Sequence, residues 1–456
     1  LVVNTDASLT IEDGGSLILS GTSEGNITYK RTIDFVSGNL KGWYLMASPV
    51  VGQAYNDAYA TTNDLATSGT NRGLATYTTN SDSWDYLQNT DSNAGTFSSG
   101  IGYSMKKGTS AGPVSFTGTL NTDDAGVDVA LSTTGNRFNL LGNPYTSYIN
   151  SATFLNSEPA VSETKTIWVW NQTLSTNGAY EVKTLSPAFI VAPGQGFFVK
   201  ANVAGGTFNF SEANQSHNGT DTFQRSSSDP EIKLLITDGE INQYGIIYYL
   251  ENATTDFDVG YDGELFGGTS NPFAIYTHLV SDSQGKNYQI QSLPNSNYEN
   301  MVIPVGVHAE AGKEITISTE TLHLPTELKV FLEDKEANIF TRLDEANTEY
   351  TVTLSETLNG IGRFYIHTTA SALSVHDVAL NSVSVYKSDA STLRIVGLPQ
   401  GNTSIKIYNV LGKQLMNTTF EVNGLKDITL PKLATGMYIV KIETEVGTLN
   451  KKIILE

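Results

Sequence analysis

The last part of the chain, residues 380–456, shows the pattern that most restricts the fold. Short runs of alternating apolar and polar residues, such as 404–408 and 437–442, are separated by turn residues that include Gly412 and Gly436. Alternation places every second side chain on the same face, so each run predicts a strand that is buried on one side. Runs that recur about every ten residues are typical of a Greek-key sandwich. We therefore expect an Ig-like sandwich over 380–456.

The composition extends this expectation to the whole chain. The 456 residues include 41 Gly and 22 Tyr, and only 16% are charged. This profile, poor in the Lys and Glu that fill exposed helices, is typical of extracellular β-rich proteins. The sequence predicts an all-β protein of tandem β-sandwich domains, jelly-roll-like or Ig-like. The absence of cysteine excludes disulfides and thiol chemistry, and no apolar run is long enough for a transmembrane helix.

The charge is unevenly distributed along the chain. The net charge is -20, from 27 Lys and Arg against 47 Asp and Glu. Residues 380–456 hold nine basic and six acidic residues, which leaves 18 basic and 41 acidic residues for the rest. An acidic body repels phosphates, so nucleic acid is not an expected partner. A slightly basic end indicates a separate role for residues 380–456.

The first 30 residues predict a hairpin or one rung of a β-solenoid. Two alternating runs, 8–12 and 16–21, flank Asp13-Gly14-Gly15, a typical turn. A single rung cannot bury its own face, so we expect residues 1–30 to cap the next domain or to end a longer solenoid. The opening of the chain within a strand favours the second interpretation.

Residues 31–225 predict a β-sandwich with an internal duplication. Residues 42–50 and 138–145 are apolar runs that each end at a proline corner, and Gly-x-Gly-aromatic runs follow at 100–106 and 194–200. Two such halves would pack face to face. Short helices are expected near 56–66 and 150–155.

The remaining boundaries follow from turn-rich and polar stretches. Residues 226–370 contain eight alternating runs after a Ser-Asp-Pro linker, and they predict a second sandwich. Residues 371–379 are expected to link it to the domain at 380–456.

Three ordered blocks at the C-terminus carry a family resemblance. They are Y-N-V-L-G-K at 408–413, L-A-T-G-M-Y-I-V at 433–440 and K-K-I-I at 451–454. Together they resemble the type A C-terminal sorting domain of the type IX (Por) secretion system of Bacteroidetes. The resemblance implies export to the cell surface or the medium, docking to the type IX translocon and to outer-membrane shuttle and attachment proteins, and frequent removal of the domain.

Five residues in these blocks are the expected sorting and docking residues. The glycines are expected to set turns, the tyrosine to anchor the sandwich, and the lysines to lie on an edge strand available for docking. These residues are Gly412, Gly436, Tyr438, Lys451 and Lys452.

No stretch predicts catalysis. Two G-x-S-x-G matches, at 21–25 and 108–112, have strand-like runs on both sides, whereas a hydrolase nucleophile requires a strand before it and a helix after it. The six histidines are scattered, without H-E-x-x-H or helical spacing. We therefore expect a protein without enzymatic activity.

An acidic loop is the best candidate for a metal site. Alternating acids with glycines between them supply the oxygen ligands that Ca²⁺ prefers, although the spacing is not that of an EF-hand. A solvated acidic turn is the alternative. The candidate ligands are Asp256, Asp258, Asp262 and Glu264, with a weaker group at Asp123, Asp124 and Asp128.

Two tryptophans suggest a sugar site. Trp168 and Trp170 alternate on a predicted strand and therefore share one face. Exposed tryptophans on one face are a usual platform for sugar rings, whereas buried ones are simply core. Both interpretations stay open at this stage.

Our main hypothesis is a non-enzymatic secreted or surface-anchored protein with stalk-like or adhesin-like β domains. One alternative is a carbohydrate-binding module or an accessory domain of a secreted glycan-degrading enzyme. Another is a self-assembling extracellular filament subunit, since edge strands pair readily between molecules.

Overall fold

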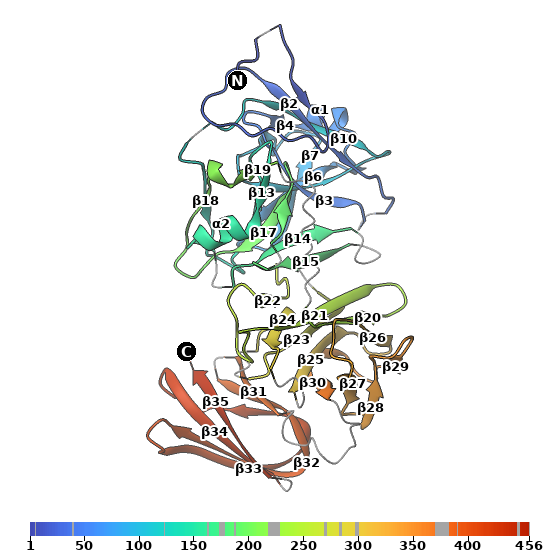
Figure 1. The fold of residues 1–456 in the computed structure, drawn as a ribbon, viewed down its shortest axis with the longest axis vertical. Coiled ribbons are helices and arrows are strands. Elements are labelled where there is room, and N and C mark those ends of the chain that lie inside the picture. Colours follow the sequence, from blue (N-terminus) through green and yellow to red (C-terminus); the bar gives the residue numbers. More distant parts are fainter. Residues whose placement is uncertain are drawn as a thin grey trace. The chain divides into compact units, whose positions relative to one another are not determined.

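The computed structural model shows an all-β chain (Figure 1). It describes residues 1–4, 6–38, 41–122, 124–161, 164–172, 178–186, 188–217, 229–268, 271–281, 285–296, 301–369, 383–389, 391–444 and 447–455. Within these ranges the helices are short: α1 (Asp57–Thr62), α2 (Ser151–Ser157) and the single 3-10 turn η1 (Glu212–Asn214). No helix in the described part of the chain is long and apolar enough to cross a membrane.

The chain divides into two compact units. The first unit contains Leu1–Ser226 and Phe266–Ser270, and the second contains Ser227–Leu265 and Asn271–Glu456. The residues expected as an N-terminal cap, 1–30, therefore belong to the first unit. The predicted linker at 371–379 lies outside the described residues.

The strands of the first unit run in two consecutive series. The first series is β1 (Thr10–Ile11), β2 (Ile27–Ile33), β3 (Trp43–Ala47), β4 (Ala54–Tyr55), β5 (Thr67–Ser68), β6 (Asn71–Thr78), β7 (Ser83–Gln88), β8 (Gly95–Thr96), β9 (Gly102–Lys106) and β10 (Gly112–Gly118). The second series is β11 (Val127–Leu131), β12 (Phe138–Gly142), β13 (Tyr148–Asn150), β14 (Ile167–Asn171), β15 (Ala179–Lys183), β16 (Ile190–Val191), β17 (Gly196–Lys200), β18 (Gly206–Phe210) and β19 (Gln215–Ser216).

The two series share one pairing pattern. The first has β3 beside β9, β9 beside β6 and β6 beside β7, and the second has β12 beside β17, β17 beside β14 and β14 beside β15. Likewise β2 pairs with β10 and β11 with β18, while β4 pairs with β8 and β13 with β16. The helices α1 and α2 occupy equivalent places, and each follows an asparagine cap, Asn56 or Asn150, whose side chain accepts a backbone N–H.

Glycines allow the two series to meet closely. A Cβ on Gly102 would lie 2.5 Å from the carbonyl oxygen of Leu141, and a Cβ on Gly142 would overlap the Cβ of Ala47. Equivalent backbone hydrogen bonds also join the two series: Ala47 N donates to Gly194 O at 2.9 Å, and Gly142 N donates to Gly100 O at 3.0 Å. The Gly-x-Gly runs are therefore explained by close packing between backbones.

Of the two arrangements expected for residues 1–30, a hairpin or one rung of a β-solenoid, the hairpin is not formed. β1 pairs in parallel with β2, with Thr10 opposite Thr28, and residues 16–21 form no strand. Instead, Leu17 N donates to Thr146 O at 2.8 Å and the buried Leu19 joins the core of the first unit. Leu17 and Leu19 therefore contact residues that are distant in sequence. These contacts explain why the local turn signal at 13–15 does not decide the strand pairing.

The second unit contains an 11-stranded sheet. Strands from distant positions in its order, including β20, β26, β27 and β30, contribute to one apolar core, so the sheet curls round it. All neighbours are antiparallel except β21 and β24. The strands are β20 (Glu231–Thr237), β21 (Asn242–Leu250), β22 (Gly263–Glu264), β23 (Ala274–Thr277), β24 (Tyr288–Pro294), β25 (Met301–Ala309), β26 (Glu314–Leu322), β27 (Lys329–Asp334), β28 (Ile339–Arg342), β29 (Glu349–Thr353) and β30 (Leu358–Thr369).

The C-terminal sheet has its own core and runs in the order β31-β32-β34-β35, with β33 paired to β32 (Figure 1). Residues 393–396 and 404–408 belong to one long strand, which has register shifts around residues 396–401. These bulges bend the sheet so that both parts of β32 face one core. The strands are β31 (Ser384–Asp389), β32 (Thr392–Asn409), β33 (Gln414–Thr429), β34 (Gly436–Thr444) and β35 (Gly447–Leu455).

Candidate functional site: the C-terminal sheet

A rigid turn joins β32 to β33. The side-chain oxygen of Asn409 accepts the backbone N–H of Leu411 at 3.1 Å and of Lys413 at 2.9 Å. Gly412 adopts a φ of 79° and donates its N–H to Asn409 O at 2.9 Å. Because this left-handed conformation disfavours other residues, glycine and asparagine fix the turn together. The turn holds Val410 and Leu411 outward, 65% and 88% exposed.

Gly436 and Tyr438 fix the start of β34. Gly436 has a φ of 156° and open space around its Cα. The ring of Tyr438 is buried in the core, and its hydroxyl donates to Ala434 O at 2.6 Å. This bond ties the segment before β34 to the core, as in the tyrosine corner of Ig-like domains.

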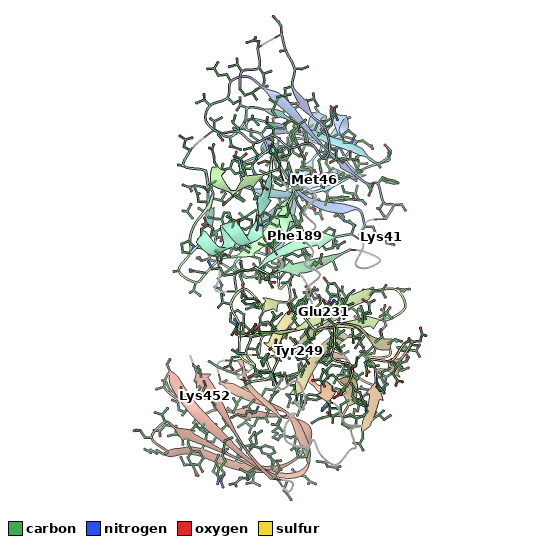
Figure 2. All side chains as sticks on the ribbon, in the orientation of Figure 1. Lys41, Met46, Phe189, Glu231, Tyr249 and Lys452 are labelled. Atoms are coloured by element: carbon green, nitrogen blue, oxygen red, sulfur yellow. The ribbon has the colours of Figure 1, made fainter. Side chains whose placement is uncertain are left out.

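The two neighbouring lysines of β35 face opposite sides of the sheet. Lys452 lies opposite Ile439 on the outer side and is exposed, whereas Lys451 lies opposite the buried Val440. Lys451 thus shares the core side with Ile453, and burial lowers the pKa of its ammonium group. Since β35 ends the sheet order, both lysines are on an edge strand, and of the two only Lys452 is exposed. Figure 2 labels Lys452 on the C-terminal sheet.

The outer face of β34 and β35 is unusually apolar. Met437 lies opposite Ile454, and the three side chains Met437, Ile439 and Ile454 are 45%, 41% and 49% exposed. Among the described residues, fifteen large apolar side chains are exposed, and six of them lie within residues 410–454. The apolar residues outside the core are therefore concentrated in this sheet.

Lysines lie beside this apolar area. Glu443 accepts from Lys406 Nζ at 2.6 Å and from Lys441 Nζ at 2.7 Å. These two hydrogen bonds lower the pKa of Glu443 to about 2. With Lys452 nearby on the same side, the face combines exposed apolar side chains with a positive margin.

The predicted calcium loop is occupied by its own hydrogen bonds. Asp258 accepts from Thr254 N at 2.6 Å, and Asp262 accepts from Asp258 N at 2.7 Å and from Ser292 N at 2.6 Å. Burial raises the pKa of Asp262 to about 7. The structure brings Asp258 and Asp262 together by folding the loop around their carboxylates.

The other predicted calcium ligands point to separate partners. Asp256 accepts from Ser281 Oγ at 2.8 Å, Glu264 pairs with Lys286 at 3.0 Å and Asp128 accepts from Asn209 at 2.8 Å. Asp123 lies outside the described residues, and Asp124 is in a turn. Across the described part of the chain, no three His, Asp or Glu residues are arranged to hold a metal ion.

Trp168 is a core residue and has no face free for a sugar, in contrast to the sugar-stacking hypothesis. It is 0% exposed, with the ring of Phe138 at 4.9 Å and that of Phe266 at 6.1 Å. Trp170 is half-buried, and its ring packs on Tyr180 at 4.8 Å. Aromatic rings in edge-to-face contact of this kind stabilise a core.

The G-x-S-x-G matches are loops between strands. Residues 108–112 connect β9 to β10, and Asp64 accepts from the Ser110 hydroxyl at 3.4 Å and from the Thr109 hydroxyl at 3.0 Å. The other match, 21–25, is likewise not followed by a helix. Both loops lack the strand–turn–helix context of a nucleophilic serine.

The exposed apolar residues of the C-terminal sheet were missed by sequence reasoning. The signal was present in β34, where Met437 and Ile439 alternate with Tyr438 and Val440 so that both faces are apolar. A strand with one face in water normally alternates with polar residues. The apolar outer face departs from that rule.

Two family models match this chain. One, described as "Domain of unknown function (DUF8693)", matches residues 1–186 and 173–367. The other, described as "Secretion system C-terminal sorting domain", matches residues 388–456, which include β32 to β35 and all five predicted sorting residues. No curated protein matches the chain.

Proposed function

Because the chain belongs to the DUF8693 family and ends in a secretion system C-terminal sorting domain, we propose that it is a non-enzymatic surface protein with stalk-like or adhesive β domains. The sorting domain indicates export by the type IX system of Bacteroidetes, to the cell surface or the extracellular medium, and interaction with its machinery. The proposal concerns what the exported β domains do there.

One observation supports a structural role more than any other: the polar clusters of both units brace the fold. Asp334, whose side chain is 0% exposed, accepts hydrogen bonds from Nε and Nη2 of Arg363 and from the Tyr350 hydroxyl. The buried Asp262 closes a loop in the same way, and the partly exposed Asp64 accepts backbone and hydroxyl donors of the 108–112 loop. Buried carboxylates satisfied by the chain's own donors contribute to a defined fold and need no substrate.

The export part is tested with the whole chain in a type IX-competent bacterium. We expect the intact chain at the surface or in the medium, and a chain lacking residues 388–456 in the periplasm. Surface delivery of the shortened chain would contradict this route.

The adhesive part is tested separately with purified full-length chain. We expect it to be retained on immobilised cells or matrix proteins, without hydrolysis of a panel of glycans, esters and peptides. Turnover of any of these substrates would show an enzyme instead.

Binding of calcium at the 256–264 loop is a secondary proposal, because Asp258 and Asp262 lie together there. Its test is the thermal unfolding of the full chain with added Ca²⁺ and with a chelator. A higher Tm with Ca²⁺ that is lost in Asp258→Asn would support the site, and equal Tm values would remove it.

A further inference from the structure

We propose that one face of the C-terminal sheet docks an acidic-rimmed apolar surface on an outer-membrane protein of the type IX machinery. The surface, here called the apolar docking face, consists of Met437, Ile439 and Ile454 on the outer side of β34 and β35, together with Val410 and Leu411 in the adjoining turn. The inference rests on the export route given above and assigns that route a surface. It differs from the sequence expectation, which placed docking on the glycines, Tyr438 and the terminal lysines.

The first argument is the unusual exposure of these side chains. They come from a turn and two paired strands: Met437 lies opposite Ile454, and Tyr438, the next residue, lies opposite Asn409 at the base of the turn. The five residues therefore gather at one end of the sheet. Scattered apolar residues on a surface are ordinary, but a contiguous group marks an interaction site.

The second argument is that the face is preorganised. The Asn409 side chain and the Gly412 conformation hold the turn, and the Tyr438 hydroxyl holds the start of β34. A surface that is already rigid loses little conformational freedom on binding, which favours affinity. The predicted sorting residues Gly412, Gly436 and Tyr438 are thus positioning residues that present the apolar side chains.

The third argument is charge. Lys406, Lys441 and Lys452 lie on the outer side of the sheet, and the acidic side chain there in the described parts of β34 and β35 is Glu443, already held by two lysines. A positive margin fits a partner whose rim carries carboxylates. A second copy of this face would bring lysines against lysines, so self-pairing is disfavoured.

The orientation of Lys451 bears on whether a partner docks on the face or adds a strand to the edge of β35. Lys451 faces the core side of β35, whereas Lys452 faces outward beside Ile439. An inward charge on an edge strand hinders pairing with another strand edge. Docking by the face is therefore favoured over addition of a strand to β35.

The test uses the full chain with aspartate at single positions. Leu411→Asp is the principal variant, because Leu411 is 88% exposed and its loss leaves the core intact. Ile439→Asp is the second. The matched control is Ile339→Asp, since Ile339 is 47% exposed on β28 and outside the face. Thermal unfolding of each purified variant verifies the fold.

Two measurements are made on each variant. The first is the fraction of chain delivered to the surface or medium of a type IX-competent bacterium. The second is binding of purified chain to the detergent-solubilised type IX translocon with its outer-membrane shuttle protein. We expect Leu411→Asp and Ile439→Asp to lower both by about tenfold, as for a central interface residue, with the control unchanged. Lys452→Glu should weaken binding less, and mainly at low salt.

Each outcome has a defined meaning. If Leu411→Asp and the control are exported and bound equally while deletion of 388–456 still blocks export, the face is not the docking surface and the export route stands. If the deleted chain is exported, the proposed route itself fails. Concentration-dependent dimers in sedimentation velocity that Ile439→Asp abolishes would overturn the proposal in favour of a second copy as the occupant.

Discussion

The first unit and the C-terminal sheet use the same residue types for opposite purposes. In the first unit, Gly102 and Gly196 stand where a Cβ would meet neighbouring backbone, at 2.5 Å and 3.0 Å. In the C-terminal sheet, Gly412 has open space around it and is required by a φ of 79°. The two regions also differ in the exposure of their apolar side chains: Trp168 of the first unit is 0% exposed, whereas Ile439 of the C-terminal sheet is 41% exposed.

This difference shows how each region is used. The first unit gains stability by removing rings and backbones from water, and Gly102, Gly196 and Trp168 are therefore internal. The C-terminal sheet has its own core on its inner face, and Tyr386 and Val396 also pack against residues of the 11-stranded sheet, so it does not need the outer face of β34 and β35 for burial. Its outer face can therefore carry apolar residues for a partner. The predictions below test that contrast through stability, from the largest expected effect to the smallest.

Trp168→Ala should cost the first unit about 3–5 kcal/mol of unfolding free energy, because a large buried ring is replaced by a cavity. All four tryptophans, Trp43, Trp84, Trp168 and Trp170, belong to this unit, so tryptophan fluorescence during denaturant unfolding reports on it alone. The three that remain still give a signal in the variant. A loss below about 1 kcal/mol would mean that Trp168 is not part of the core.

Asp262 should make the second unit less stable as the pH rises. Burial raises its folded pKa to about 7, above the usual value near 4, so the folded state binds the proton more tightly than the unfolded state. Its contribution is full below about pH 4 and falls by up to about 1.4 kcal/mol per pH unit as the pH rises towards 7.

Urea unfolding followed by far-UV circular dichroism from pH 4 to pH 7 measures this effect. Asp262→Asn should flatten the dependence, while Asp256→Asn, on the exposed side of the same loop, should leave it unchanged. Identical pH profiles for the Asp262 variant and the unmodified chain would refute the assignment.

Gly102→Ala should destabilise the first unit by about 1–3 kcal/mol through overpacking, since the new methyl group meets the Leu141 carbonyl. Gly112→Ala is the matched control. Gly112 has ordinary φ, and the nearest atom to a new Cβ would be Lys107 Nζ at 3.8 Å. Tryptophan fluorescence again measures both, and equal stabilities would show that the close backbone contact does not constrain position 102.

Gly412→Ala should cost about 1–2 kcal/mol locally, because a side chain is strained in the left-handed conformation. Gly412→Asn should cost less, since asparagine tolerates that conformation. Hydrogen–deuterium exchange at the turn between β32 and β33 would reveal the loss, with tryptophan fluorescence unchanged. Faster exchange in the asparagine variant than in the alanine variant would argue against the turn geometry.

Much of this protein could be inferred from local pattern. The alternating runs determine the all-β class, because period-two burial has few other solutions. The blocks around Gly412, Tyr438 and Lys451 indicated the sorting domain, which the family comparison confirms. The repeated Gly-x-Gly runs have counterparts in the matched pairing of β3 with β9 and of β12 with β17.

Other features required the tertiary structure. Residues 16–21 alternate like a strand, yet Leu17 and Leu19 contact parts of the chain that a local turn signal does not specify. The tryptophan pattern at 168 and 170 is the same for a sugar platform and for a core, and only the packing of Phe138 and Phe266 decides between them.

The acidic loop and the C-terminal sheet show the same physical limit on what can be predicted from residue spacing. Residue spacing gives the side of a strand or loop on which a group lies, but not the donor or the neighbour that meets it there. The sequence by itself thus determined the strand periodicity, the turn at Gly412 and the address at the C-terminus. Tertiary structure alone decided which apolar side chains are buried, because burial depends on contacts between segments that are distant in sequence.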